Sequence, residues 1–205
     1  MYYRYRRGRF WAFSGREVGE LLISWGILGV VFGRAMFGSY SGFSVGMGLA
    51  LLGLAFVPHE LSHKFAAIRF GRIAEYRMWT WGLLLAVFLV AIGSPIIFAA
   101  PGAVYITSSY DPFPWRARRE DGLISLAGPL ANAVFAAGSY LAYAIGIAPF
   151  LFGYLFYVNL FLGSFNMLPI PPLDGSKVFS WNKVAWLVLA IAMWVPLLYV
   201  TVGIP

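Results

Sequence analysis

The 205-residue chain contains no cysteine, only two histidines and few charged residues. The lack of cysteine excludes disulfides, thiolate metal sites and a cysteine nucleophile. Charged residues make up 11% of the chain, whereas a soluble globular protein carries about 25%. Hydrophobic residues make up 60%. This balance predicts an integral membrane protein that contacts the lipid bilayer.

Basic residues exceed acidic ones, and the formal net charge is +7. Such a charge can indicate nucleic-acid binding, but the positions of the basic residues, given below, indicate membrane orientation instead. No nucleic-acid partner is therefore expected. The basic, aromatic N-terminal stretch is not followed by the short apolar core and small-residue cleavage site of a signal peptide. We expect the first apolar run to be retained as a span.

Five apolar runs have the length of a transmembrane helix, which takes about 20 residues. The chain is therefore predicted to be an all-α polytopic membrane protein with about five transmembrane helices. No repeat, low-complexity tract or long linker divides it, so residues 1–205 are expected to form a single membrane-embedded domain. The predicted spans are residues 18–37, 44–70, 122–147, 149–168 and 183–203.

A sixth apolar run, residues 83–100, is broken by Gly93-Ser94-Pro95. Two short segments flank this run, RIAEYRMW at 72–79 and GAVYIT at 102–107. The alternation in the first and the β-branched residues in the second are typical of extended structure. We therefore expect short β-strands on either side of the broken run.

The sequence HELSH at 59–63 stands near the end of an apolar run. On a helix, residues four apart share a face, so His59 and His63 can bind one metal ion. Zinc accepts imidazole nitrogens and keeps a position open for water in catalytic sites. Glu60, on the adjacent face, can take the proton of that water. The alternative is a polar helix end at the membrane interface, but ionisable residues inside a membrane are costly and indicate function.

A zinc site with two histidines needs a third protein ligand, and the absence of cysteine and of further histidines leaves a carboxylate. Asp174 stands out because it ends the stretch FNMLPIPPLD, in which three prolines prevent a regular helix. Non-helical backbone in a membrane is tolerated only where protein or a wet cavity surrounds it. Asp-Gly is also a common turn pair, so a plain interfacial turn is the alternative.

A third motif, AGPLAN at 127–132, opens the apolar part of a predicted helix. Gly128 either allows close helix packing or has a direct role in a site. Asn132 directs an amide into the helix bundle, where it either joins helices by hydrogen bonds or binds a peptide carbonyl or oxyanion. We favour the second role for Asn132.

The three motifs together resemble the site-2 protease family of intramembrane zinc metalloproteases. The motifs are HELSH at 59–63, AGPLAN at 127–132 and FNMLPIPPLDG at 165–175, and the resemblance covers roughly residues 44–176, the expected core of the domain. Order and spacing agree with the family. Ser62 departs from the glycine often found at its position, but it is small and should be tolerated.

This resemblance implies that His59, His63 and Asp174 bind one zinc ion per chain and that Glu60 is catalytic. It implies that Asn132 assists substrate binding or oxyanion stabilisation. The implied partners are transmembrane protein substrates within the bilayer.

Topology restricts how the motifs can meet. HELSH lies near the C-terminal end of its span and AGPLAN near the start of its own, so the segment between them must cross the membrane an even number of times. The run 83–100 therefore cannot be a single crossing. We predict a re-entrant hairpin, or a pair of embedded strands, between the helix of HELSH and the helix of AGPLAN.

The basic residues agree with this layout. The loops opposite the site, GSYSGF and the one near Gly146, carry no lysine or arginine, and Arg34 is the exception. Because these residues favour cytoplasmic loops, we predict a multi-pass protein of the cytoplasmic membrane whose N-terminus and active-site mouth are cytoplasmic. The basic residues on the side of the site are Arg4, Arg6, Arg7, Arg9, Arg16, Lys64, Arg69, Arg72, Arg77, Arg116, Arg118, Arg119, Lys177 and Lys183.

The leading functional hypothesis is an endopeptidase that cleaves transmembrane segments with zinc-activated water, with Glu60 as base and then proton donor. The alternative is a non-proteolytic relative that binds metal or client helices, and Glu60 argues against it because a structural site has no use for a base. A metal transporter would need ionisable residues along a path through the membrane, and the outer halves of the spans have almost none beyond Arg34. No oligomeric state is predicted.

Overall fold

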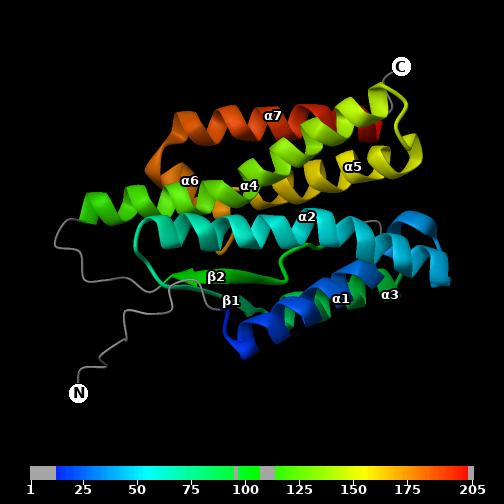
Figure 1. The fold of residues 1–205 in the computed structure, drawn as a ribbon, viewed down its shortest axis with the longest axis horizontal. Coiled ribbons are helices and arrows are strands. Elements are labelled where there is room, and N and C mark those ends of the chain that lie inside the picture. Colours follow the sequence, from blue (N-terminus) through cyan, green and yellow to red (C-terminus); the bar gives the residue numbers. More distant parts are fainter. Residues whose placement is uncertain (1–12, 95–96, 107–113, 203–205) are drawn as a thin grey trace.

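The computed structural model describes residues 13–94, 97–106 and 114–202. These residues are mostly helical, with one pair of short strands between the helices (Figure 1). The elements are α1 (Gly15–Phe37), α2 (Gly42–Arg69), β1 (Ala74–Met78), α3 (Thr80–Ala91), β2 (Gly102–Ile106), α4 (Pro114–Ala144), α5 (Pro149–Asn166), α6 (Asp174–Trp181) and α7 (Lys183–Val202).

Helix α2 lies in the middle of the molecule (Figure 1). It packs against α1 on one side and against α4 and α5 on the other, and α7 covers α5 and α6 from outside. The long helices α1, α2, α4, α5 and α7 run in alternating directions, as in a protein that crosses a membrane repeatedly. The strands and α6 lie toward the end of the molecule where α2 ends and α4 begins.

Four helices are long and apolar enough to cross a membrane, namely α1, α2, α4 from Trp115 onward, and α7. The fifth predicted span corresponds to α5, an 18-residue helix that carries Asn159 and Asn166 and is not among these four. A polytopic helical protein is thus confirmed in its coarse form, and the crossing by α5 stays a prediction.

Close contact between α1 and α2 depends on glycine. A Cβ added to Gly48 would lie 2.7 Å from the backbone nitrogen of Gly33, closer than real Cβ atoms approach other heavy atoms. Small residues of this kind let transmembrane helices approach backbone to backbone. The contact brings the N-terminal helix against the helix that carries HELSH.

The two predicted strands are confirmed. β1 and β2 pair antiparallel, with Tyr76 opposite Val104 and Met78 opposite Gly102. The chain between them forms α3, turns at Gly93 with φ 70°, and returns, so that the Trp79 backbone N–H donates to the Pro101 carbonyl at 2.6 Å.

The segment from residue 79 to residue 101 therefore leaves the end of β1 and comes back to the start of β2 next to it. The outgoing half of this segment is the helix α3, which fits the predicted re-entrant hairpin and not the alternative of a pair of embedded strands. The predicted break is described up to Ser94, and Pro95 lies outside the described residues. Re-entry of this segment into the membrane stays a prediction.

Two carboxylates of α1 occupy the outer edge of β1. The Tyr76 backbone N–H donates to Glu17 at 3.1 Å, and the Met78 N–H donates to Glu20 at 2.9 Å. Glu17 is 1% exposed and also forms an ion pair with buried Lys64 of α2. These side chains take the place of a third strand, so the edge of β2 is the one available for further pairing.

Candidate metal centre

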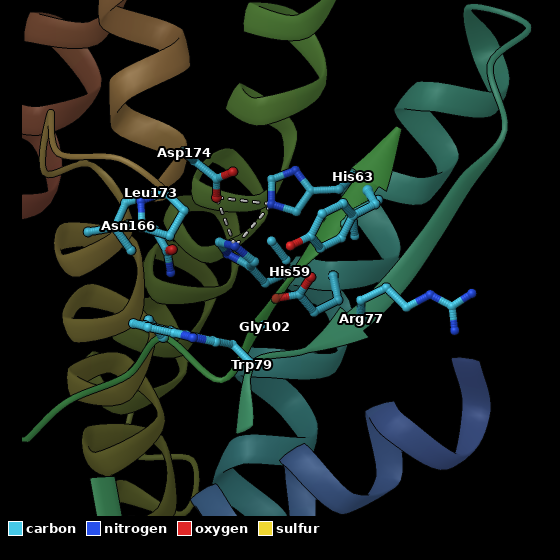
Figure 2. Close-up of a pocket in the computed structure, with 14 residues that line it drawn as sticks. His59, His63, Arg77, Trp79, Gly102, Asn166, Leu173 and Asp174 are labelled. Atoms are coloured by element: carbon cyan, nitrogen blue, oxygen red, sulfur yellow. Dashed lines mark hydrogen bonds and ion pairs between the residues drawn. The ribbon is translucent and has the colours of Figure 1, made fainter. Parts of the chain in front are cut away.

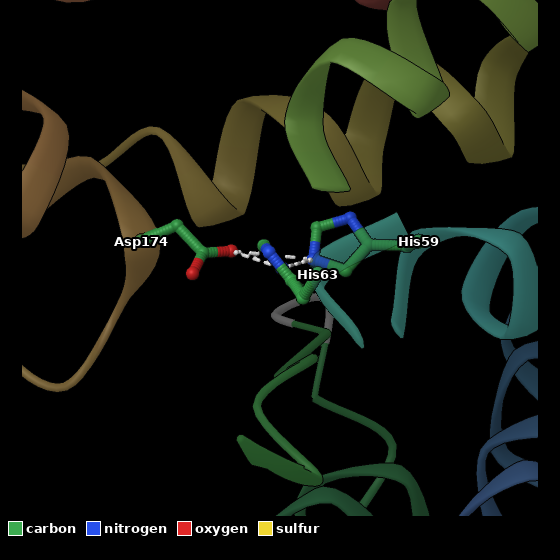
Figure 3. Close-up of side chains that lie close together, drawn as sticks. All are labelled: His59, His63 and Asp174. Atoms are coloured by element: carbon green, nitrogen blue, oxygen red, sulfur yellow. Dashed lines mark hydrogen bonds and ion pairs between the residues drawn. The ribbon is translucent and has the colours of Figure 1, made fainter. Parts of the chain in front are cut away.

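Helix α2 presents His59 and His63 on one face, one turn apart. Both side chains are almost fully buried, at 3% and 4% exposure. Their Nε2 atoms lie 3.1 Å apart and point to the same spot (Figure 3). The helical spacing expected from the sequence is therefore realised in the fold.

Asp174 completes this group from the other end of the chain. Its Oδ2 atom lies 3.2 Å from His59 Nε2 and 3.0 Å from His63 Nε2 (Figure 3). Asp174 is the first residue of α6, a helix that the sequence analysis did not predict. The next residue is Gly175, and only glycine fits at this position, because a Cβ there would lie 2.5 Å from the Leu168 carbonyl oxygen. The Asp-Gly pair therefore belongs to a packed helix start against the end of α5 and not to a free turn.

Hydrogen bonds on the far side of each ring determine which nitrogen faces the centre. His63 Nδ1 lies 2.7 Å from the Ile124 carbonyl of α4, which can only accept, so this nitrogen carries the proton. His59 Nδ1 lies 2.6 Å from Asn132 Oδ1 and donates in the same way. Each neutral ring then presents an unprotonated Nε2 to the centre. This arrangement is typical of metal-binding histidines.

The donor set fits a zinc ion. Two Nε2 lone pairs and a carboxylate oxygen, all within 4.8 Å of one another, converge on one point. Protons on both Nε2 atoms would repel at the observed separation of 3.1 Å. Three acceptors that face each other in a buried space need a cation, and two histidines with one carboxylate form a common catalytic zinc set.

Glu60 follows His59 on α2 and lines the same cavity as the three ligand residues. It is 7% exposed, and its Oε2 atom has no hydrogen-bond partner among the described residues. A buried carboxylate oxygen without a partner is costly. Its position next to the ligand group suits a contact with water in the cavity.

The cavity has a volume of about 140 Å³, enough for a few water molecules. Besides the ligands, the cavity is lined by residues 102–105 of β2, by Asn166 of α5 and by Trp79 at the start of α3 (Figure 2). Asn166 belongs to the motif FNMLPIPPLDG, but the sequence alone predicted no role for it. Its place in this motif was the one available signal, because the direction of its side chain depends on how α5 packs.

Asn132 lies next to the metal centre, as its motif suggested, but behind the His59 ring. It is 1% exposed, and it does not belong to the residues that line the cavity. Its Nδ2 donates to the Ala55 carbonyl at 3.1 Å and to Asn159 Oδ1 at 2.9 Å. All of its polar atoms are thus engaged within the helix bundle. Its predicted role in oxyanion binding would need these contacts to break.

Two features hold α4 against the metal-binding helix. Arg72, just after α2, is 6% exposed and forms ion pairs with Glu120 at 2.7 Å and with Asp121 at 2.6 Å. Gly128 of α4 packs directly against both imidazole rings. Together they keep the Ile124 carbonyl within reach of His63.

Gly128 provides a test of this packing. A Cβ there would lie 2.6 Å from His63 Cε1 and 2.7 Å from His59 Cε1, so Gly128→Ala must displace the rings. We expect a drop in zinc affinity of at least about tenfold, measured by competition with a chelator. Gly138→Ala on the same helix is the matched control, because its Cβ meets nothing within 4 Å. Equal zinc affinity in the two variants would contradict the contact.

Comparison with known proteins gives related sequences. The chain is 40% identical over 195 residues to the candidate zinc metalloprotease MJ0611 of Methanocaldococcus jannaschii, a match that covers 88% of this chain and 92% of the relative. It is 29% identical over 142 residues to YwhC of Bacillus subtilis, covering 62% of this chain and 64% of the relative. It is 32% identical over 141 residues to Rip2 of Mycolicibacterium smegmatis, covering 57% and 49%.

YwhC and Rip2 are also named as candidate zinc metalloproteases. No protein-family model and no solved structure matches the chain.

Proposed function

The chain belongs to the same family as the candidate zinc metalloprotease of Methanocaldococcus jannaschii, and from this premise we propose that it is an intramembrane zinc endopeptidase of the site-2 protease type. The observation that carries the proposal is the convergence of His59, His63 and Asp174 beside the unpartnered Glu60 oxygen. These groups lie within a bundle of apolar helices, where a protein without such chemistry would not keep them.

Each residue of the site has a separate role in the proposed peptide hydrolysis. His59, His63 and Asp174 hold the zinc ion, which when bound supplies a Lewis acid that activates water at neutral pH. Glu60 takes the proton of the attacking water and passes it to the nitrogen of the leaving amine. Asn166 also lines the cavity; its Nδ2 donates to the Leu162 carbonyl at 3.0 Å, and the second N–H of this amide can contact the carbonyl of the scissile bond.

The edge of β2 is the proposed docking position for the substrate. Gly102 and Val104 lie opposite Met78 and Tyr76, whose N–H groups point away from β2 to the α1 carboxylates, so the polar groups of Gly102 and Val104 face the opposite edge. Gly102 and Val104 also line the cavity of the metal centre. A substrate segment that has lost its helical hydrogen bonds can add to this edge as a strand. Its peptide bond would then lie next to the metal centre.

This arrangement gives the substrate class. A helical peptide bond is shielded by its own hydrogen bonds, so the substrate must unwind locally before cleavage. The proposed substrates are therefore transmembrane segments of other membrane proteins, which reach the site within the bilayer.

Purified protein with a panel of single-span proteins in vesicles tests this function. We expect cleavage products whose new termini, determined by mass spectrometry, lie within the apolar segment of the substrate. Cuts confined to loops outside the membrane would overturn the intramembrane site. No cleavage by a protein that holds one zinc per chain would favour the non-proteolytic alternative.

The proposed orientation places the mouth of the site on the cytoplasmic side. Because the chain lacks cysteine, single cysteines introduced at Glu75 of β1 and at Ile145, which is 73% exposed beyond α4, report opposite ends of the molecule. We expect an impermeant thiol reagent to label Glu75→Cys only from the cytoplasmic side and Ile145→Cys only from outside. Ser109→Cys, outside the described residues, should label like Glu75→Cys. Labelling of Glu75→Cys and Ile145→Cys from one side would disprove the topology.

A further inference from the structure

Asn159 is a buried polar residue in the middle of α5 that the proposed chemistry does not use. Its exposure is 0%, and the residues next to it on the helix, Val158 and Leu160, are apolar and buried. An amide at this depth needs hydrogen-bond partners. Asn159 Nδ2 donates to the Leu155 carbonyl at 2.9 Å, and its Oδ1 accepts from Asn132 Nδ2, also at 2.9 Å.

These contacts form a chain of hydrogen bonds with one possible direction. A backbone carbonyl can only accept, so the Leu155 carbonyl requires the NH₂ group of Asn159 on its side and leaves Asn159 Oδ1 to face Asn132. Asn132 must then turn its NH₂ group to Asn159 and to the Ala55 carbonyl, at 2.9 and 3.1 Å. Asn132 Oδ1 is left for His59.

The direction of this chain decides where His59 carries its proton. Asn132 Oδ1 accepts from His59 Nδ1 at 2.6 Å, so the proton lies on Nδ1 and the lone pair lies on Nε2, toward the metal centre. If the Asn132 amide were rotated by half a turn, its NH₂ group would face Nδ1. The proton would then move to Nε2 and occupy the position of the metal bond.

We propose that Asn159 is a positioning residue, which acts together with the Ala55 carbonyl to hold the Asn132 amide in one orientation and thereby keeps His59 in its metal-binding tautomer. The inference rests on the metal site of the proposed function but not on peptide cleavage. It gives the α5 helix a part in metal binding even though Asn159 touches neither the ligands nor the cavity. His63 does not depend on Asn159, because its Nδ1 faces the Ile124 backbone carbonyl.

The tautomers of His59 and His63 can be measured separately, so the dependence of His59 alone on Asn159 can be tested. The chain has only two histidines, so selective ¹⁵N labelling of histidine gives two sets of ring signals by NMR. In the metal-free protein at mildly alkaline pH, we expect wild-type His59 to show one tautomer with the proton on Nδ1. In Asn159→Leu, which keeps the volume but removes the acceptor, we expect a mixture of both tautomers for His59 and no change for His63.

Zinc affinity provides the second measurement. We expect Asn159→Leu to bind zinc about tenfold more weakly or worse. Asn159→Asp should restore both the tautomer and the affinity, because a carboxyl oxygen at this position still accepts from Asn132 Nδ2. Ser139→Ala is the control, since Ser139 is 3% exposed on α4 and, within the part of the chain that the structure describes, donates to the Phe135 carbonyl of its own helix. If Asn159→Leu does not fold, both measurements can be made on Asn159→Ser instead. The serine side chain is too short to contact Asn132, so this variant also removes the hydrogen bond.

A role of Asn159 in helix packing alone predicts a different result. Asn159→Leu would then change thermal stability while the His59 tautomer and the zinc affinity stayed as in wild type, and this outcome would overturn the proposal. A protein that binds zinc in this manner but cleaves no substrate would contradict the proposed function and leave the positioning role intact.

Discussion

Glu60→Gln is expected to keep one zinc per chain and to lose cleavage. The amide is nearly isosteric with the carboxylate, and Glu60 is not among the three convergent ligand atoms, so metal binding should not change. Glutamine cannot accept the proton of the attacking water. Since general-base catalysis contributes about 10² to 10⁴ in rate, cleavage should fall to a few per cent or less.

The measurement pairs metal analysis with a cleavage assay on the same preparation. Glu75→Gln is the matched control, because Glu75 lies on β1, is partly exposed and pairs with Arg77 at 2.5 Å. It should cleave like wild type. Cleavage by Glu60→Gln above a few per cent of the wild-type rate would show that another group serves as the base.

Replacement of both histidines should remove zinc altogether. In His59→Ala with His63→Ala, Asp174 is the one member of the ligand group that remains, and the chain has no further histidine or cysteine to replace the others. A single carboxylate does not hold zinc against a chelator. Metal content measured by mass spectrometry should drop from one zinc per chain to none.

Thermal unfolding gives an independent measurement of the same loss. A ligand at 100 times its Kd stabilises the folded state by about 2.7 kcal/mol, so zinc should raise the unfolding temperature of the wild type but not that of the double variant. Asp174→Asn should also lose this response, whereas Glu75→Gln, at a partly exposed carboxylate of β1 paired with Arg77, should keep it. Zinc bound at full amount by the double variant would place the metal site elsewhere.

The sequence by itself determined the parts of the site that depend on local geometry. Because a helix repeats every 3.6 residues, the spacing of His59 and His63 was sufficient to place both rings on one face. The apolar runs were sufficient to predict α1, α2, α4 and α7 as candidate spans, since each is defined by its own length and composition. Parity also predicted that the segment around residues 83–100 comes back to where it leaves, and β1 and β2, on either side of it, are paired.

Only the tertiary structure decided how distant side chains support the rings. Nothing local to Asn132 indicates that its oxygen faces His59, and nothing local to Asn159 indicates that it faces Asn132. These contacts depend on the relative rotation of α2, α4 and α5, which the packing of the whole bundle determines. The helical start at Asp174 likewise depends on Gly175 against the end of α5. Spacing along one helix determines which residues share a face, but orientation between helices determines which atom of a side chain meets which partner.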